Sequence, residues 1–404
     1  MKMRGLSVLI GVCFVDMLGL MMVAPLMPFY ASRLGSPDWM IGPLIASFAL
    51  AQLLASTWWG RISDRYGRRP VLLAGLAGSA VAFVVFGFAG SLWMLFLSRI
   101  VQGLGGGTTG VAQAYVADMV APGERAKALG WLSAGTSAGV VVGPAIGSLT
   151  RNWGIAAPGL TAAAIMLLNL VAAWYWLPES KGARPSGVFT PAGGTPVAEP
   201  RSASRAVWEI VRHPTRPAHR VIWIYCVGML ALNVLIGILA LYLRDTFAVT
   251  EQTIGYFFPI FGIVGVLMRV SIVGWANDRL GEVRTMRLGA VIMALGLALM
   301  PLPRSLTLFI VCLVLSPVGT ALLFPASTAL VSHRASKREL GLMMGAQQTL
   351  RGIMSIIGPI GGTLVYDTLG HGVPMFMAAV IVAAAGLLAV REPHERPAPA
   401  TIGP

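Results

Sequence analysis

Long apolar stretches recur along the whole chain and are separated by short polar segments. A helix crosses the bilayer core, about 30 Å thick, with about 20 apolar residues. Runs of about this length predict twelve membrane-spanning helices, at residues 6–30, 39–60, 71–89, 92–117, 128–150, 156–177, 220–243, 254–275, 287–303, 306–330, 341–366 and 374–390. Some connections, such as Gly90–Ser91, are so short that the helices they join must be antiparallel neighbours. The pattern therefore predicts an all-α polytopic membrane protein.

One long polar stretch, residues 178–219, divides these helices into two sets of six. It is rich in Pro, Gly and Ser and cannot bury a core of its own. We therefore expect an N-terminal six-helix bundle (1–177), a cytoplasmic linker (178–219), a C-terminal six-helix bundle (220–391) and a cytoplasmic tail (392–404). Within the linker, Ser204 to Arg212 predicts either an amphipathic helix at the membrane surface or a plain flexible segment.

Composition agrees with a membrane protein and excludes several classes. The 404 residues are 56% hydrophobic and 11% charged, with a mean hydropathy of +0.75, whereas soluble domains carry about 25% charged residues. A soluble enzyme and a nucleic-acid binder are therefore excluded. No metalloprotease, nucleophile-elbow or P-loop motif occurs, and the three cysteines show no metal-ligand spacing. We therefore expect no enzymatic activity, no metal and no cofactor.

The net charge of +14 is explained by where the basic residues lie. With the N-terminus inside, 23 of the 30 Lys and Arg residues fall in predicted cytoplasmic segments and four in the opposite loops. Cytoplasmic loops of membrane proteins carry such an excess. We expect a multi-pass protein of the inner (plasma) membrane with both termini in the cytoplasm.

The chain contains an internal repeat. The residues Gly60, Asp64, Arg65 and Gly67 recur in the second half, in the same order and spacing, as Gly274, Asp278, Arg279 and Gly281. The pair Gly143-Pro144 recurs as Gly358-Pro359, at nearly the same offset. Two landmarks with nearly one offset indicate homologous halves related by an axis along the membrane normal. In such architectures the substrate site lies between the halves, near the bilayer midplane.

The predicted cytoplasmic loop Gly60 to Pro70 reads GRISDRYGRRP. It resembles the signature loop of the major facilitator superfamily, G-x-x-x-D-R-x-G-R-R, at every fixed position. The resemblance extends over the whole chain, and it implies a conformational latch formed by Gly60, Asp64, Arg65, Gly67 and Arg68. It further implies that Asp64 meets the start of the helix near residues 340–344, and that Arg68 pairs with Asp118. Gly60 is expected to permit close helix approach.

Two considerations limit the latch interpretation. Positive-inside topology alone would account for the arginines, but not for Asp64 or the glycines. The copy around Asp278 has Glu282 and Val283 in place of the paired arginines, so its latching role is weaker.

The helix at residues 92–117 carries Arg99, Gln102 and Gly103, which match the R-x-x-Q-G motif of the same family. The family associates this Arg with proton transfer. Because arginine does not deprotonate in proteins, we expect Arg99 to tune a nearby carboxylate or to contact substrate. The alternative is a structural arginine bonded to backbone carbonyls.

Glycines recur every fourth residue in the helix at 128–150, where Pro144 removes a backbone donor. Gly139, Gly143, Pro144 and Gly147 resemble the family's antiporter motif, G-x-x-x-G-P-x-x-G-G, which is associated with exporters. Ser148 replaces the last Gly of the motif. A second copy includes Gly358 and Pro359. The alternative is close helix packing through small residues without an antiport role.

Asp16 is the only carboxylate well inside a predicted span. Its surroundings, with Gly19, Pro25 and Pro28, resemble the first helix of tetracycline and multidrug exporters in the twelve-helix drug:proton antiporter group. Together with Arg99 it is our candidate for proton coupling, because a desolvated carboxyl facing an Arg can exchange a proton near neutral pH. The alternative is a structural partner of Arg99 or Arg351 that never titrates.

Seven further polar residues inside the spans are candidates for the substrate cavity: Gln52, Gln102, Gln113, Tyr115, Asn233, Gln347 and Arg351. The sequence thus predicts a proton-coupled exporter of small lipophilic compounds that works by alternating access, the two halves rocking about a midplane site. The alternative is a transporter of the same fold for a sugar, metabolite, siderophore or lipid. The expected partners are a small-molecule substrate, protons and the lipid bilayer, with no nucleic acid, and we expect a monomer.

Overall fold

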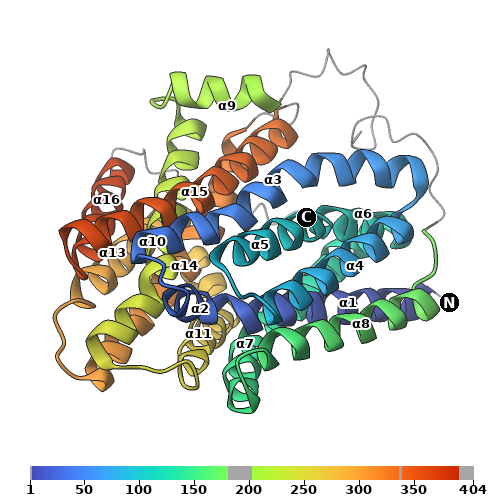
Figure 1. Cartoon of the computed structure of the whole chain (residues 1–404). Helices are drawn as coiled ribbons and strands as arrows, with labels where there is room; N and C mark the ends of the chain where they lie inside the picture. The colour runs from blue at the N-terminus through green and yellow to red at the C-terminus, as the bar shows by residue number, and fades with distance from the viewer. Residues whose placement is uncertain (1, 181–202, 336–338, 391–404) are drawn as a thin grey trace, which may run out of the picture. The chain divides into compact units, whose positions relative to one another are not determined.

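The computed structural model describes residues 2–180, 203–335 and 339–390, and every regular element in these ranges is a helix (Figure 1). The chain forms two compact units, which are described separately. Unit 1 comprises Met1–Pro196, Val234–Ile263 and Ser355–His371, and unit 2 comprises Val197–Asn233, Val264–Met354 and Gly372–Pro404, each as far as it is described. The domain boundaries at 177 and 220 stay a prediction. The tail 392–404 and residues 181–202 of the predicted linker lie outside the described residues.

Unit 1 contains the helices of the first half of the chain. These are α1 (Lys2–Val23), η1 (Ala24–Leu26), α2 (Met27–Arg33), η2 (Asp38–Met40), α3 (Ile41–Tyr66), α4 (Arg68–Gly87), α5 (Leu92–Gly106), α6 (Thr109–Met119), η3 (Pro122–Glu124), α7 (Arg125–Thr150), η4 (Arg151–Trp153) and α8 (Ala157–Trp176). Helix α1 packs against α7 and α8, and α5 packs against α3 and α4.

Unit 1 also includes parts of three helices from the second half of the chain. They are the later part of α10 (Pro217–Phe247), the start of α11 (Phe258–Met268) and the later part of α15 (Leu340–Leu369), and unit 1 holds the whole of η5 (Ile254–Tyr256) besides. Short helix η5 packs against α7. Unit 1 therefore joins segments of both halves.

Unit 2 contains the other helices of the second half. These are α9 (Ala203–Arg212), the first part of α10, the end of α11, the π-helical turn η6 (Arg269–Val273), α12 (Gly274–Leu280), α13 (Glu282–Leu299), α14 (Leu306–Arg334), the first part of α15 and α16 (Val373–Val390). Helix α13 packs against both α14 and α16. In α9, Ala206 and Ile210 are buried, and the Trp223 indole N–H donates to the Ile210 carbonyl at 3.2 Å. The segment 204–212 is thus helical, and its place at a membrane surface stays a prediction.

Within the described ranges, eight helices are long and apolar enough to cross a membrane, at residues 5–33, 38–66, 68–87, 127–153, 157–176, 217–247, 254–280 and 306–334. The other four predicted spans correspond to α5 with α6, α13, α15 and α16. Three spans differ from the expected continuous helices, and of these the fourth is interrupted between α5 and α6. The first bends through η1, where Pro25 and then Pro28 interrupt the backbone hydrogen bonds. The eighth continues to Leu280 through the π turn at Arg269–Val273.

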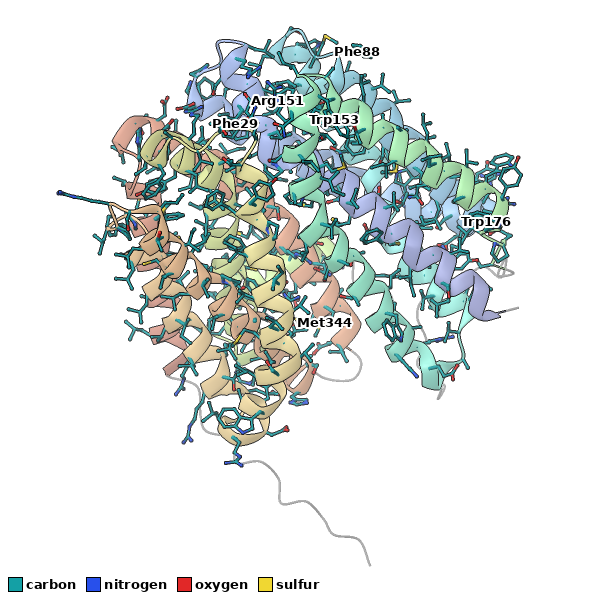
Figure 2. The ribbon with its side chains drawn as sticks, turned by 90° about the horizontal axis from the view of Figure 1, so that it is seen from below. Phe29, Phe88, Arg151, Trp153, Trp176 and Met344 are labelled. Carbon is teal, nitrogen blue, oxygen red and sulfur yellow. The ribbon has the colours of Figure 1, made fainter. Side chains whose placement is uncertain are left out.

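Exposed tryptophans mark the two ends of α8. The helix has 20 residues, and a rise of about 1.5 Å per residue makes its length match the bilayer core. Trp153 precedes the helix and Trp176 ends it, and both indoles are largely exposed. Figure 2 shows Trp153 near Arg151 and Phe29 at one end, and Trp176 at the other. This placement is typical of aromatic residues at membrane interfaces.

The internal repeat recurs in the backbone. Gly67 lies between α3 and α4 with φ +100°, and Gly281 lies between α12 and α13 with φ +78°. Such positive φ values strongly favour glycine. The two glycines of the repeated motif therefore make the same sharp helix-to-helix turn in each half.

Candidate functional site

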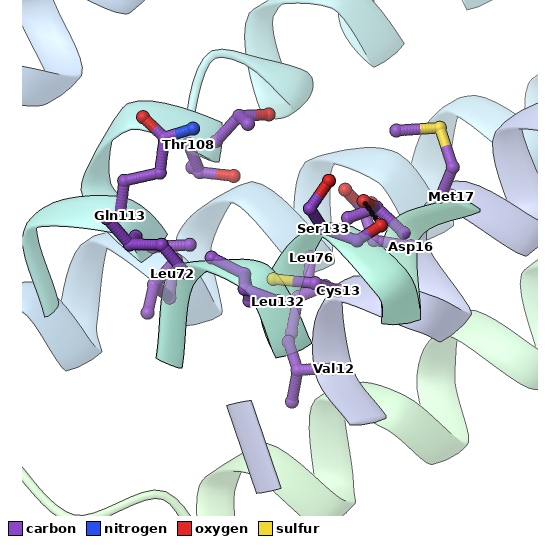
Figure 3. Close-up of a pocket in the computed structure, with 14 residues that line it drawn as sticks. Val12, Cys13, Asp16, Met17, Leu72, Leu76, Thr108, Gln113, Leu132 and Ser133 are labelled. Carbon is purple, nitrogen blue, oxygen red and sulfur yellow. Dashed lines mark hydrogen bonds between the residues drawn. The ribbon is translucent and has the colours of Figure 1, made fainter. Parts of the chain in front are cut away.

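A cavity of about 260 Å³ lies in unit 1 among α1, α4, α6 and α7. Its walls are mostly apolar, and its polar lining residues are Cys13, Asp16, Thr108, Thr109, Gln113, Ser133 and Thr136. Figure 3 shows Asp16 and Ser133 on one side and Thr108 and Gln113 on the other. The cavity therefore places one carboxyl group opposite hydroxyl and amide groups.

The Asp16 carboxylate makes no hydrogen bond or ion pair with any described residue of unit 1. Arg99 in particular, its expected partner, is not paired with it. Nearby, the Thr136 hydroxyl donates to the Ser133 carbonyl of its own helix at 2.8 Å. The carboxyl group is thus free to bind a proton, a cation or a hydrogen-bond donor from a ligand, one at a time.

A break in the predicted helix 92–117 creates one wall of the cavity. Helix α5 ends at Gly106 and α6 begins at Thr109, so carbonyl groups near the break lose their helical partners. Side chains of α3 replace them: the Gln52 amide donates to the Gly106 carbonyl at 3.1 Å, and the Trp59 indole donates to the Leu104 carbonyl at 2.5 Å. Irregular backbone at membrane depth is tolerated where protein groups satisfy it in this way. The break leaves Thr108 and Thr109 facing the cavity.

The antiporter glycines bring α7 into close contact with α1. A Cβ atom at Gly139 would lie 2.5 Å from the Phe14 carbonyl oxygen, and one at Gly147 would lie 2.0 Å from the Met22 carbonyl oxygen. Only glycine allows this approach of two backbones. Because Asp16 lies between these contacts on α1, and Ser133 and Thr136 precede them on α7, the packing positions both walls of the cavity.

Arg99 and Gln102 are almost fully buried on α5, at 3% and 2% exposure. Neither Nε nor one terminal nitrogen of Arg99 has a hydrogen-bond partner, and neither does Oε1 of Gln102. These two nitrogens of Arg99 therefore do not bond to backbone carbonyls, as the structural alternative would require. Both residues lie outside the lining of the Asp16 cavity.

The other predicted cavity residues are in varied surroundings. Gln113 lines the Asp16 cavity, whereas the Tyr115 hydroxyl donates to the Pro178 carbonyl at 2.7 Å. In the second half, the Asn233 amide donates to the Met229 carbonyl of its own helix at 2.7 Å. In unit 2, Gln347 is buried and donates to the Thr328 hydroxyl at 3.3 Å, and Arg351 is exposed.

The loop between α3 and α4 holds a network of charges. Arg68 lies 2.5 Å from an Asp64 oxygen and 3.1 Å from Oδ2 of Asp118, so the expected pair of Arg68 with Asp118 is present. Beyond the neighbouring backbone of α3 itself, no described atom lies within 4 Å of the place that a Cβ at Gly60 would take. The expectation that Gly60 permits close helix approach is therefore not met within unit 1. Asp64 is half-exposed.

Glu179 is part of this network and was missed from the sequence. Its carboxylate accepts from the backbone N–H groups of Arg68 and Arg69, at 2.8 and 3.3 Å. It therefore caps the N-terminus of α4, where an anion is favoured by the helix dipole. A Cβ at Gly67 would lie 2.8 Å from Glu179 Oε1. No sequence signal placed residue 179 beside this loop, because 111 residues separate it from Arg68.

The second copy of the loop, in unit 2, carries an ion pair of reversed polarity. Glu282, at the place of Arg68, lies 3.1 Å from Nδ1 of His333, which falls at the place of Asp118 in the repeat. The pair is ionic only when the imidazole is protonated. Asp278, one turn earlier, corresponds to Asp64.

Ion pairs also gather at the opposite end of unit 1, which the topology predicts to face outside and which we call the outer end. Glu251, between α10 and η5, accepts from Arg33 at 2.7 Å and from Arg151. Arg244 of α10 pairs with Asp38 at 2.9 Å, next to Asp245. These pairs link the first half of the chain to segments from the second half within unit 1.

Comparison with known proteins identifies the fold and the family. The family model described as Major Facilitator Superfamily matches residues 9–272 and 221–403. The chain belongs to the major facilitator superfamily.

Relatives and a solved structure agree with this assignment. The class C tetracycline resistance protein of Escherichia coli is 30% identical over 371 residues, covering 90% of each chain. Multidrug resistance protein 2 of Bacillus subtilis (strain 168) is 28% identical over 390 residues, covering 95% of this chain and 94% of the relative. The crystal structure of the human organic anion transporter MFSD10 (TETRAN) aligns with a TM-score of 0.68 at 20% identity, covering 96% of this chain and 99% of that one.

As a major facilitator protein, the chain is a multi-pass membrane transporter of small molecules with the all-α, two-bundle fold, and it is not an enzyme. Several lining residues of its Asp16 cavity were absent from the predicted sites: Cys13, Thr108, Thr109, Ser133 and Thr136. Cys13 lies one turn before Asp16 on α1 and could have been found from helical spacing. The others depend on the break before α6 and on the pairing of α1 with α7, which the sequence pattern does not specify.

Proposed function

We propose that this transporter exports small, fairly lipophilic compounds, such as drugs, in exchange for protons. The observation that carries the proposal is the cavity around Asp16, where one carboxyl group, without a partner among the described residues of unit 1, faces hydroxyl groups and apolar side chains. A proton and a substrate that donates a hydrogen bond or carries a positive charge can each occupy this carboxyl group, but not both together. Such competition is the basis of exchange, because a substrate can bind only after the proton leaves.

The cavity is small for a complete drug molecule. Ligand pockets typically measure about 300–1,000 Å³, and this one measures about 260 Å³. We propose that it holds the polar part of the substrate and that the rest lies between the halves of the transporter, as in other repeat architectures. The residues proposed to line that larger space are Gln52, Gln102, Gln113, Tyr115, Asn233, Gln347 and Arg351.

Arg99 is proposed to assist coupling from its buried position on α5. A guanidinium group with unsatisfied N–H groups in a low-dielectric interior attracts an anionic or hydrogen-bond-accepting group strongly. We propose that Arg99 stabilises the ionised form of Asp16 in one stage of the cycle, after a movement of α1 or α5.

Export requires that the cavity open to each side in turn. We propose alternating access in which the halves rock about the midplane, and in which Asp64, Arg68 and Asp118 form a latch at the inner end with Asp278 as a weaker copy. The close packing of α7 on α1 through Gly139, Gly143 and Gly147 supports this proposal, because rigid contact lets the helix pair that forms the cavity move as one body.

The named relatives support the choice of cargo. Proteins called tetracycline resistance and multidrug resistance proteins align over about 90% of the chain. We propose that tetracycline-like and other lipophilic drugs are substrates here too. The basic-residue pattern supports a place in the inner (plasma) membrane with both termini in the cytoplasm, and we propose that the monomer is the working form.

The test is transport by purified protein in liposomes with an imposed pH gradient. We expect drug accumulation driven by the gradient in the natural protein and none in Asp16→Asn. Asp367→Asn is the matched control, because Asp367 is an exposed carboxylate at the end of α15 and outside the cavity. Full pH-driven transport by Asp16→Asn would refute the coupling role. A panel that also contains sugars and other metabolites decides the cargo, since drug transport without sugar transport is expected.

A further inference from the structure

Two hydroxyl groups occupy equivalent places in the repeat and both bond to backbone at the outer end of unit 1. The Ser148 hydroxyl on α7 donates to the Glu251 carbonyl at 2.9 Å and accepts from the Gly255 N–H at 2.8 Å. The Thr363 hydroxyl on α15 lies 3.0 Å from the Trp39 carbonyl. The offset between positions 148 and 363 is the one that relates the two Gly-Pro pairs of the repeat. The contacts are therefore two copies of one arrangement.

Each hydroxyl group follows a proline by four residues and faces a glycine near the start of a helix from the other half of the chain. A Cβ at Gly255 would lie 1.9 Å from the Pro144 carbonyl oxygen, and a Cβ at Gly42 would lie 2.5 Å from the Pro359 carbonyl oxygen. Both glycines therefore permit a backbone contact that any side chain would block. The two copies therefore share the close approach of a glycine to a proline carbonyl as well as the hydrogen bond of the hydroxyl group.

The two hydroxyl groups differ in how much they contribute. Ser148 uses both its donor and its acceptor for bonds across unit 1. Thr363 has one hydroxyl proton, and it is shared with the Pro359 carbonyl of its own helix, also at 3.0 Å. Removing the hydroxyl group of Ser148 should therefore have the larger effect.

The ion pairs around these contacts do not follow the repeat. Glu251 bridges Arg33 and Arg151 beside Ser148, whereas Arg244 bonds Asp38 near the Thr363 contact. Partly exposed ion pairs contribute little on average. The hydrogen bonds to backbone groups need a fixed distance and angle. They therefore fix the docked position, that of α7 against residues 251–255 and of α15 against residues 39–42, more closely than the ion pairs do.

We propose that Ser148 and Thr363 are conformational clasps, which hold the outer ends of the two halves together and must break before the transporter opens outward. The proposal rests on the alternating access proposed above. Ser148 stands where the antiporter motif has its last glycine, so this chain has gained two bonds that a Ser148→Gly variant would lose. The clasps therefore bias this transporter toward the state that is closed at the outer end.

The expected shift in the equilibrium between open and closed outer ends follows from the net free energy of a hydrogen bond. With each bond taken at the low end of its typical net contribution, one intramolecular bond changes an equilibrium about twofold, and the two bonds of Ser148 change it about fivefold. We expect Ser148→Ala to raise the ratio of open to closed outer ends about fivefold, and Thr363→Val about twofold because it makes one such bond across unit 1. The clasps share no partner, so the effects should multiply to about tenfold in the double variant.

The experiment measures chemical access to a residue that the clasps cover. Ile254 in η5 is fully buried, and Ile254→Cys in a chain whose three natural cysteines are replaced by Ala is the reporter. A membrane-impermeant maleimide is added outside proteoliposomes without substrate or pH gradient. When opening is fast relative to labelling, the rate follows the population of the open state. We expect rates about five, two and ten times that of the reporter alone in Ser148→Ala, Thr363→Val and the double variant.

The matched control is Thr150→Val, because the Thr150 hydroxyl bonds only to carbonyls of its own helix among the described residues. It should leave the rate unchanged, and Thr363→Ser, which keeps the hydroxyl group, should do the same. Equal rates in Ser148→Ala and Thr150→Val would overturn the proposal. So would faster labelling from the inside of the liposome than from the outside.

A second variant covers the case in which Ser148→Ala fails to fold. Gly255→Ala keeps both hydroxyl groups but places a methyl group against the Pro144 carbonyl, so it should also raise the labelling rate. An unchanged rate in Gly255→Ala would overturn the docked position itself. The transport assay separates the two proposals: raised labelling without pH-driven export refutes the proposed function and keeps the clasps, and export with unchanged labelling refutes the clasps alone.

Discussion

The contact of α7 with α1 predicts opposite effects for one chemical change at two positions on the same helix. Gly147→Ala and Gly130→Ala each add one methyl group to an interior position of α7. In an open position this change stabilises a helix by about 1 kcal/mol. Beyond the neighbouring backbone of α7 itself, no described atom lies within 4 Å of a Cβ at Gly130, whereas a Cβ at Gly147 would lie 2.0 Å from the Met22 carbonyl oxygen. The first variant should be neutral or slightly stabilised, and the second destabilised.

The size of the difference follows from the distance. Ordinary contact begins at 3.4 Å, so α7 must move away from α1 by more than 1 Å at Gly147. Overpacking of this kind costs about 1–3 kcal/mol, and the movement also weakens the contact at Gly143. We therefore expect Gly147→Ala to be less stable than Gly130→Ala by about 1–3 kcal/mol.

Thermal unfolding in detergent, followed by the monodisperse fraction after heating, measures this difference. An apparent Tm lower by at least a few degrees in Gly147→Ala than in Gly130→Ala is expected, since about 1 kcal/mol corresponds to about 2–4 °C in domains of this size class. Equal or reversed apparent Tm values would refute the packing of α7 on α1.

Three further changes test other parts of the site. Glu179→Gln should lower the stability of the natural protein by about 1 kcal/mol, because it removes the charged cap of α4; thermal unfolding beside the exposed Glu124→Gln as control checks this, and equal loss in both would contradict it. Gln52→Leu should destabilise by about 0.5–1.5 kcal/mol, because the Gly106 carbonyl would lose its shorter hydrogen bond and keep only the Thr109 hydroxyl at 3.4 Å; a stability equal to that of the natural protein would show that the break before α6 does not need Gln52. Asp118→Asn should weaken the hold on Arg68 by about 0.2–1 kcal/mol, as for exposed ion pairs, and a double-mutant cycle with Arg68→Gln measures the coupling, which should be absent if the pair does not form.

The sequence predicted the features that depend on composition along the chain. Hydropathy located the segments that became helices, and the recurrence of Gly67 as Gly281 indicated homologous halves, with which the positive φ of both glycines agrees. The pair of Arg68 with Asp118 came from a motif whose spacing is fixed by one loop and one helix end. These features are local, or they belong to a family pattern.

The sequence did not predict features that depend on neighbours far apart in the chain. Glu179 reaches the start of α4 only because α8 returns alongside α4. The hydroxyl groups of the Asp16 cavity face it only because α5 ends at Gly106 and because glycines set the approach of α7 to α1. Hydrophobic periodicity does not specify where a helix breaks or how closely two helices pack. For this reason a polar residue in an apolar helix could not be assigned in advance to the cavity or to helix packing.

If Asp16 exchanges a proton for substrate, the binding of substrate must release a proton into solution. Purified protein in weakly buffered detergent solution with a pH indicator is mixed with tetracycline or another lipophilic drug. We expect the natural protein to release protons and the release to fall as the pH rises, because Asp16 is then deprotonated before mixing. We expect no release from Asp16→Asn. Undiminished release by Asp16→Asn, with drug binding intact, would show that Asp16 does not carry the exchanged proton.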